Sequence, residues 1–243
     1  MEKLGVVRIA GRFQGPTGQG QGGWTASRLA AFADGPVTVR LAAPTPLDVD
    51  LDVVREGDAL ELIDPRGRTP RTIMQAELWT PDVPETAPVS VDAARAARLA
   101  FRFDESKHPA PNCFSCGVSH ESMQVKAGLL GDGRVATDWR PPAWATRDDG
   151  AVDLGVVWAA MDCAAGWFVG ADGGGGSLIF TAQYAVEVRR PLVAEAEYAV
   201  VAWSGDGAGG WEGRKRTAAS MTFDAAGEVV AAARSLWIAA RPQ

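Results

Sequence analysis

The chain has 243 residues, of which 47% are hydrophobic and 22% are charged. This is the composition of a globular protein, and it argues against a disordered chain. A formal net charge of −6 argues against a basic face for non-specific binding to nucleic acid or anionic lipid. We therefore expect neither nucleic acid nor a membrane among the partners of the protein.

The expected location follows from the N-terminus and the cysteines. The N-terminus lacks the regions of a signal peptide, and no run of about 18 apolar residues is present. The three cysteines are few and odd in number, which fits a reducing compartment better than a disulfide framework. These features predict a cytoplasmic protein.

The N-terminal third reads as strands around one short helix. A glycine-rich bend at 15–23 precedes an apolar helix predicted over Trp24–Ala33. Alternating or β-branched runs between Gly, Pro and Asp breaks predict antiparallel strands. These strands are Val6–Phe13, Val37–Leu41, Leu47–Val54, Ala59–Ile63 and Thr72–Trp79.

A linker separates this part from the rest of the chain. Prolines are spaced through Pro81–Pro88, and the Ala, Arg and Leu content of Val91–Phe101 favours a helix. We expect that helix to bridge the two parts of the molecule.

The C-terminal part repeats the order of strand, helix and several strands. Gly131-Asp132-Gly133 predicts a hairpin, and the nearly apolar run Leu154–Val169 predicts a buried helix. The glycines Gly173–Gly176 predict a flexible loop, which no Lys-Ser or Lys-Thr follows to make a nucleotide site. The predicted strands are Met123–Leu130, Arg134–Trp139, Leu178–Val188, Glu197–Trp203, Arg214–Phe223 and Val229–Ala239.

The repeated order predicts two similar units in one chain. The units are an N-terminal degenerate unit at 1–80 and a C-terminal unit at 108–243, with the linker and its short helix at 81–107.

The C-terminal unit resembles the hotdog thioesterases of the phenylacetate-pathway type. That family carries His-Gly-Gly at the start of its helix and an acid nine positions after the histidine. Here Asp153-Leu154-Gly155 starts the helix, and Asp162 stands nine positions after Asp153. The sequence Cys113-Phe114-Ser115-Cys116-Gly117 and the final hairpin around Asp224-Ala225-Ala226-Gly227 are also similar to features of the group.

The resemblance implies an α+β tandem, or double, hotdog fold. Two antiparallel sheets would each wrap a central helix, and the units would join as an intramolecular pseudo-dimer. The likeness is strongest over about 108–240. Over 1–80 it rests on Gln21-Gly22-Gly23, the short helix and the order of strands.

Each unit departs from the family pattern in a different way. The C-terminal unit keeps the acid Asp162, but Leu154 replaces the first glycine. The N-terminal unit keeps both glycines, Gly22 and Gly23, but Ala30 stands at the position of the acid. A composite site of Gly22, Gly23 and Asp162 would be complete, whereas the mirror site would lack its acid.

Such a site suits thioester hydrolysis. Amide hydrogens at a helix N-terminus stabilise the negative charge that develops on the carbonyl oxygen, and glycines let the substrate approach. Asp162 would act as general base or as nucleophile. The candidates for substrate binding are Gln21, Leu154, Gly155, Arg214 and Arg216. The two arginines would meet the phosphates of coenzyme A, or else lie on a solvated face of the sheet.

A second set of residues could bind zinc. His108 and His120 flank Cys113 and Cys116, and together they offer four ligands. The spacing matches no standard zinc finger, and a turn closed by packed thiols is the alternative. We expect no metal and no other cofactor to be required.

Three functions remain open from the sequence. They are hydrolysis of acyl-CoA or another acyl thioester, binding of acyl groups without turnover, and dehydration by a hotdog enzyme. The last is disfavoured because neither histidine lies in a helix motif. The chain would be a monomeric pseudo-dimer or a homodimer of tandem chains.

Overall fold

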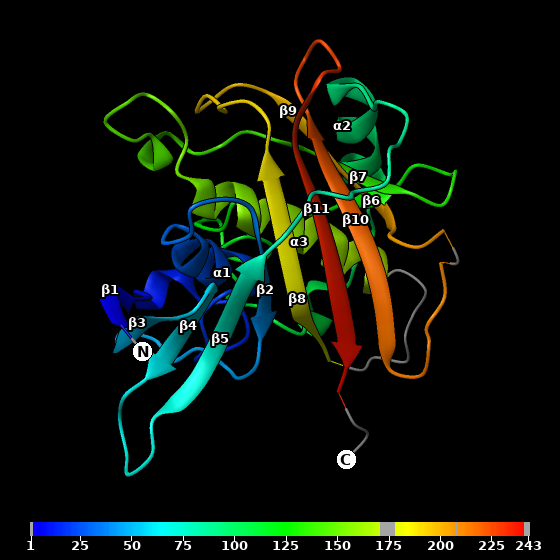
Figure 1. The fold of residues 1–243 in the computed structure, drawn as a ribbon. Helices are drawn as coiled ribbons and strands as arrows, with labels where there is room; N and C mark the ends of the chain where they lie inside the picture. The colour runs from blue at the N-terminus through cyan, green and yellow to red at the C-terminus, as the bar shows by residue number, and fades with distance from the viewer. Residues whose placement is uncertain (1, 171–177, 208, 241–243) are drawn as a thin grey trace.

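The computed structural model describes residues 2–170, 178–207 and 209–240. These residues form an eleven-stranded antiparallel sheet and three α-helices (Figure 1). The helices are α1 (Gly22–Ala30), α2 (Val91–Ala100) and α3 (Leu154–Gly170). The strands are β1 (Glu2–Arg8), β2 (Val37–Leu41), β3 (Asp50–Glu56), β4 (Ala59–Asp64), β5 (Arg71–Leu78), β6 (Gly128–Leu129), β7 (Val135–Trp139), β8 (Ile179–Val188), β9 (Tyr198–Ser204), β10 (Lys215–Phe223) and β11 (Val229–Ala239).

The two expected sheets are in fact one continuous sheet. Its strand order is β1-β3-β4-β5-β2-β8-β11-β10-β9-β7-β6, so the strands of each unit stay together. The units join where β2 pairs with β8, with Val39 opposite Tyr184. The expectation of two sheets was wrong because side-chain alternation predicts strands but does not say which strand edges meet. Pairing the two edges satisfies backbone groups that would otherwise be exposed.

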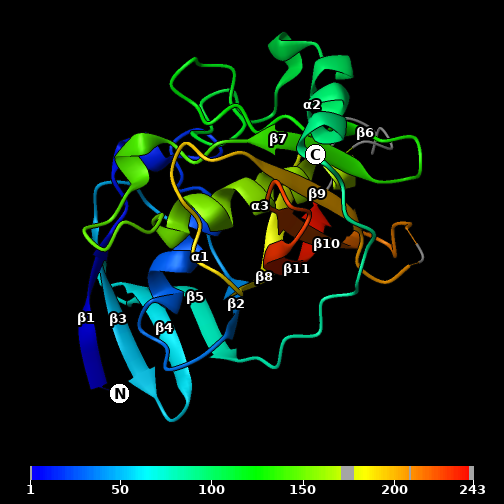
Figure 2. The same ribbon diagram turned by 90° about the horizontal axis from the view of Figure 1, so that it is seen from above.

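Helices α1 and α3 lie side by side against the same sheet (Figures 1 and 2). Helix α3 is buried along most of its length, and its many alanines allow close packing against the strands and against α1. This arrangement brings the N-terminus of α1 to the middle of α3, where Asp162 stands. The packing of both helices on the sheet holds the N-terminus of α1 against Asp162.

Helix α2 does not bridge the units, as the sequence had suggested. It packs on β6, β7 and β9 of the C-terminal unit. On β9, Ala199 and Val201 belong to the small core under α2, whereas Val200 and Ala202 belong to the main core. Because neighbouring strand residues point to opposite faces, α2 covers the face away from α3. The division at 80 and 108 remains a prediction.

The other predicted elements agree with the structure to different extents. Strand β2 has the predicted bounds, but the predicted strand Met123–Leu130 is reduced to β6. The physical reason is that the amides of Met123 and Val125 donate to Phe114 and Ser115 of the cysteine loop instead of to a strand. The predicted loop Gly173–Gly176 lies outside the described residues.

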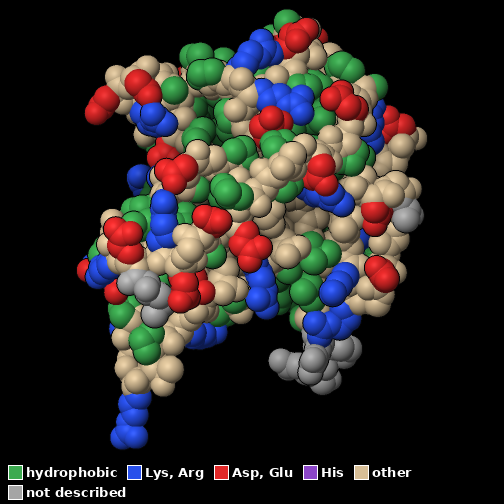
Figure 3. Space-filling model, in the orientation of Figure 1, with side chains coloured by type: hydrophobic (Ala, Val, Ile, Leu, Met, Phe, Trp, Pro, Cys, Tyr) green, Lys and Arg blue, Asp and Glu red, His purple; other side chains and the backbone are tan. Residues whose placement is uncertain are grey.

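The surface in the view of Figure 3 carries acidic and basic side chains interspersed. None of the helices in the described parts of the chain has the length and hydropathy needed to cross a bilayer.

Candidate active site

The N-terminus of α1 is held by the side chain of Gln21. The Oε1 atom of Gln21 accepts a hydrogen bond of 2.6 Å from the amide of Trp24, so Gln21 is the N-cap of the helix. Its Nε2 atom points the other way and donates to Oδ2 of Asp162 at 2.6 Å. Gln21 thus joins the helix start of one unit to the carboxylate of the other.

Asp162 is 3% exposed and accepts three hydrogen bonds. Oδ2 accepts from the amide of Gly23 at 3.1 Å as well as from Gln21, and Oδ1 accepts from Oγ1 of Thr181 at 2.8 Å. Burial favours the neutral acid and raises the pKa of Asp162 to about 7, although these donors favour the charged form. The carboxyl can therefore gain or lose a proton near neutral pH.

Thr181 is a site residue that the sequence analysis missed. It lies on β8, where Gln183 pairs with Leu236 and Thr181 pairs with Trp237, which leaves one extra residue between them. This bulge reverses the side-chain alternation, so Thr181 and Tyr184 both turn toward α3. No pattern in the sequence marked the bulge.

The two glycines of α1 have different surroundings. A Cβ atom at Gly23 would lie 2.6 Å from the carbonyl oxygen of Trp158, so only glycine lets α1 approach α3 this closely. A Cβ atom at Gly22 would lie 3.4 Å from Oδ2 of Asp162, in a partly exposed position. Within the described residues, the amide of Gly22 has no hydrogen-bond acceptor. This amide therefore keeps a hydrogen bond to donate.

The mirror position at the N-terminus of α3 is filled by side chains. Asp153 accepts from the amide of Gly155 at 2.7 Å and forms an ion pair with Arg28 of α1. A Cβ atom at Gly155 would clash with Arg28 and with the ring of Trp24. Leu154 is 41% exposed and Ala30 carries no polar side-chain atom. Leu154 and Gly155 are therefore not brought near Asp162 in any described contact, and their expected role in substrate binding has no support from this geometry.

The two arginines proposed for phosphate binding are placed differently. Arg214 is exposed. Arg216 is 4% exposed, donates to the carbonyl oxygen of Val169 at 2.9 Å and lies over the ring of Phe168. Strand β10 turns the Arg216 side chain inward to the C-terminus of α3, where a cation is favourable, so this geometry gives no support to phosphate contact by Arg216.

The two histidines of the possible zinc set do not join its two cysteines. His108 uses both ring nitrogens, since Nδ1 accepts from the amide of Ala110 at 3.0 Å and Nε2 donates to the carbonyl oxygen of Cys116 at 3.1 Å. His120 is exposed. The alternative zinc set of His108, Cys113, Cys116 and His120 therefore has no support from this geometry. Cys163 of α3 takes the place of the histidines beside the two loop cysteines.

Two surface cavities lie beside α2 and not at Asp162. One is lined by Phe101, His108 and Lys126 among others, and the other by Trp139 and Glu197 among others. Gly22 and Thr181, which both lie beside Asp162, are partly exposed.

Solved structures match the fold over its whole length. The tesB protein of Mycobacterium avium subspecies paratuberculosis is 18% identical, with a TM-score of 0.58, and the match covers 99% of this chain and 96% of that one. A protein of Novosphingobium aromaticivorans, provisionally assigned as a thioesterase, is 12% identical, with a TM-score of 0.56 and coverage of 97% and 95%. The chain has a hotdog fold. No protein-family model and no curated protein sequence matches this chain. At these identities the likeness establishes the fold alone.

Proposed function

We propose that this protein hydrolyses acyl thioesters, with acyl-CoA as the first substrate class to test, at one composite site per chain. The observation that carries the proposal is the contact between a buried carboxylate of one unit and the helix N-terminus of the other. Asp162 meets Gln21 and Gly23 there, beside the available amide of Gly22. The name of the full-length structural neighbour from Novosphingobium aromaticivorans, a provisionally assigned thioesterase, supports the same reaction class.

The proposed reaction uses Asp162 to activate water or to attack the thioester directly. As a base, the carboxylate takes a proton from water while the water oxygen bonds to the carbonyl carbon. The resulting oxyanion accepts a hydrogen bond from Gly22, at the positive end of the α1 dipole. The carbon–sulfur bond then breaks, and the departing thiolate receives the proton from Asp162. The products are a carboxylic acid and a free thiol.

Gln21, Gly23 and Thr181 act as positioning groups in this proposal. Their donors fix the carboxylate and stabilise its charged form against the effect of burial. Without them, the pKa of Asp162 would rise further and less of the active base would be present at neutral pH.

The test is a panel of acyl-CoA thioesters with short, medium, long and aromatic acyl groups. Release of free thiol is measured for the unaltered protein and for Asp162→Asn. We expect release from at least one member of the panel and its loss in the variant. Release at an unchanged rate in the variant would refute the assignment of Asp162.

Acyl binding without turnover is the second candidate, favoured by one observation. Asp162 is nearly inaccessible, and it already occupies the amide of Gly23. Saturable binding of an acyl-CoA, measured by calorimetry, together with no thiol release from the whole panel would favour this reading. A dehydratase is not proposed, because neither His108 nor His120 contacts Asp162 in the described structure.

We also propose that a single chain suffices for the site. Both α1 and α3 come from one chain, so the pair that single hotdog units obtain by association is already present. A monomer or a dimer of such chains would then be equally active per chain.

A further inference from the structure

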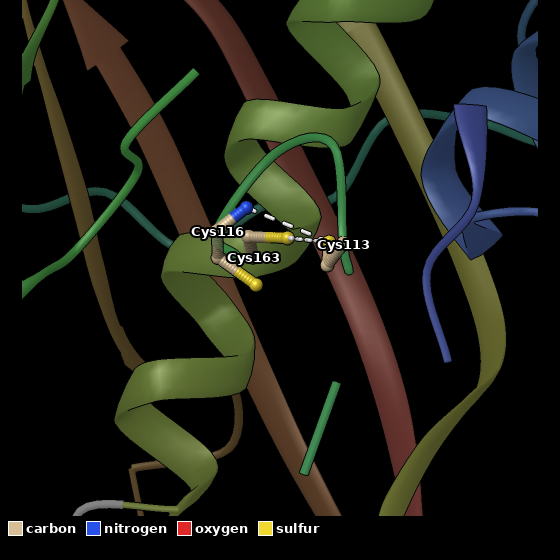
Figure 4. Close-up of side chains that lie close together, drawn as sticks. All are labelled: Cys113, Cys116 and Cys163. Atoms are coloured by element: carbon tan, nitrogen blue, oxygen red, sulfur yellow. Dashed lines mark hydrogen bonds between the residues drawn. The ribbon is translucent and has the colours of Figure 1, made fainter. Parts of the chain in front are cut away.

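Three cysteines from two distant segments meet behind the candidate active site. Cys113 and Cys116 lie on the loop before β6, and Cys163 lies on α3 (Figure 4). The Sγ atoms of Cys113 and Cys163 are 3.8 Å apart, and all three sulfurs lie within 4.8 Å of one another. A disulfide needs about 2.05 Å between its sulfurs, and all three thiols are free.

The loop is built to hold its two cysteines in place. The amide of Cys116 donates to Sγ of Cys113 at 3.5 Å, and the amide of Gly117 donates to the carbonyl oxygen of Cys113 at 2.7 Å. A Cβ atom at Gly117 would lie 2.4 Å from that oxygen, so the turn requires glycine. His108 braces the same turn through the carbonyl oxygen of Cys116. The sulfurs are thus presented by a fixed turn and not by a mobile segment.

The spacing of the sulfurs fits coordination of one ion. A metal–sulfur bond of about 2.3 Å places tetrahedral ligands ~3.8 Å apart, which matches the separation of Cys113 and Cys163. The remaining sulfur needs a shift of roughly 1 Å or less to reach the same separation. Rotation of the Cys116 side chain about its Cα–Cβ bond can supply that shift.

The donors select the kind of ion. Among the described residues, the cluster contains sulfur ligands alone. His108 has committed both ring nitrogens, and Asp162 is held by Gln21, Gly23 and Thr181 outside the cluster. Sulfur ligands favour soft cations, and they disfavour Mg²⁺ or Ca²⁺. We propose that Cys113, Cys116 and Cys163 bind one thiophilic cation with a filled d shell, Zn²⁺ or Cu⁺.

The protonation pattern of the cluster is compatible with such an ion. Hydrogen bonds from Cys116 and Cys163 hold the pKa of Cys113 well below its usual value, while the pKa values of those two thiols are raised. The three thiol groups therefore compete for the same protons. A cation would replace those protons and be held by the same three sulfurs.

The binding test uses the full-length, fully reduced protein with Co²⁺ as the spectroscopic probe. We expect one equivalent of Co²⁺ to give a sulfur-to-cobalt charge-transfer band, and one equivalent of Zn²⁺ to remove it. A parallel competition with Cu⁺ in a chelator buffer tells which of the two ions binds more tightly. Zn²⁺ should also release protons on binding, and this readout needs no variant.

Variants then locate the site. Cys113→Ser and Cys163→Ser should each weaken binding by about 100-fold or more, whereas His120→Ala, which removes an exposed histidine near the loop, should not change it. Circular dichroism verifies that each variant is folded. The proposal is overturned if the unaltered protein gives no charge-transfer band and takes up neither Zn²⁺ nor Cu⁺. It is equally overturned if Cys163→Ser binds as tightly as the unaltered protein.

Discussion

The N-termini of α1 and α3 occupy equivalent places in the two units, yet their electrostatics are opposite. At α1, no cation of the described residues pairs with the buried Asp162, and its pKa is raised to about 7. At α3, burial also favours the neutral form of Asp153, but the hydrogen bond and charge of Arg28 outweigh it and lower the pKa. The comparison teaches that a neighbouring cation, and not helix position alone, decides whether a carboxylate here can act as a base near neutral pH.

The largest expected effect separates the two carboxylates directly. Asp162→Asn should reduce thioester hydrolysis by about 10²–10⁴-fold, because the variant lacks a base of suitable pKa. Asp153→Asn is the matched control, since asparagine also serves as an N-cap and should leave the rate within about twofold. Steady-state release of thiol measures both. Equal losses in the two variants would show that the asymmetry has no catalytic meaning.

Gly22→Ala would make the α1 site more like the mirror site, where Leu154 carries a side chain. The added Cβ would lie 3.4 Å from Oδ2 of Asp162, in the space assigned to the substrate. We expect kcat/KM to fall by about 10²-fold. The thermal midpoint should change little, because the close approach of the added Cβ to Cδ2 of Leu41 at 3.2 Å opposes the gain from restricting the unfolded chain. A large loss of stability would instead mean that Gly22 is needed for the fold.

The pH dependence should sharpen the same comparison. Below about 7, kcat/KM should rise about tenfold per pH unit as Asp162 loses its proton, and above that value it should level off. A pH-independent rate between 5 and 8 would contradict this.

The stability of the folded protein should carry the opposite signature. The folded-state pKa of Asp162 lies above the unfolded value, so ionisation of this carboxyl lowers the free energy of unfolding. The loss of stability is absent below a pH of about 4, grows as the pH rises and is complete above about 7. The cost amounts to at most ~4 kcal/mol. Asp162→Asn should therefore gain stability relative to the unaltered protein between pH 4 and 8 in chemical denaturation.

The smallest effect concerns the residue that the sequence did not reveal. Thr181→Val removes a donor to Oδ1 and should raise the pKa of Asp162, so the rise in kcat/KM shifts to higher pH. The rate at high pH should change by less than about threefold, since Asp162 itself remains. Thr146→Val, away from Asp162, is a control. An unchanged pH profile in Thr181→Val would remove Thr181 from the site.

Much of the secondary structure could be predicted from the sequence, whereas the way in which the two units join could not. Alternation of apolar residues predicted the bounds of β2 and the burial of α3, since both depend on local pattern. The β2–β8 pairing depends on which edges meet in space, and nothing local to either strand encodes that. The position of α2 was missed for the same reason.

Some features of the candidate site could likewise be predicted from the sequence, and others could not. The spacing of Asp162 and the pair Gly22 and Gly23 could be found because a resemblance supplied their register, and their catalytic role stays a prediction. The inward turn of Arg216 and the engagement of both nitrogens of His108 could not be found, because they depend on tertiary hydrogen bonds. The histidines are near Cys113 and Cys116 in the sequence, which suggested them as further ligands. In the structure it is Cys163 of α3 that lies beside these two cysteines.

The β2–β8 seam has a consequence for motion. Opening the molecule between its units would break the main-chain hydrogen bonds of that pairing and expose Val39 and Tyr184, both fully or almost fully buried. Hinge closure of the kind found in two-lobed enzymes is therefore too costly to admit a ligand here. For the proposed function we therefore expect a ligand to enter by local fluctuation around the partly exposed Gly22 and Thr181, on the fast timescales of side chains and loops.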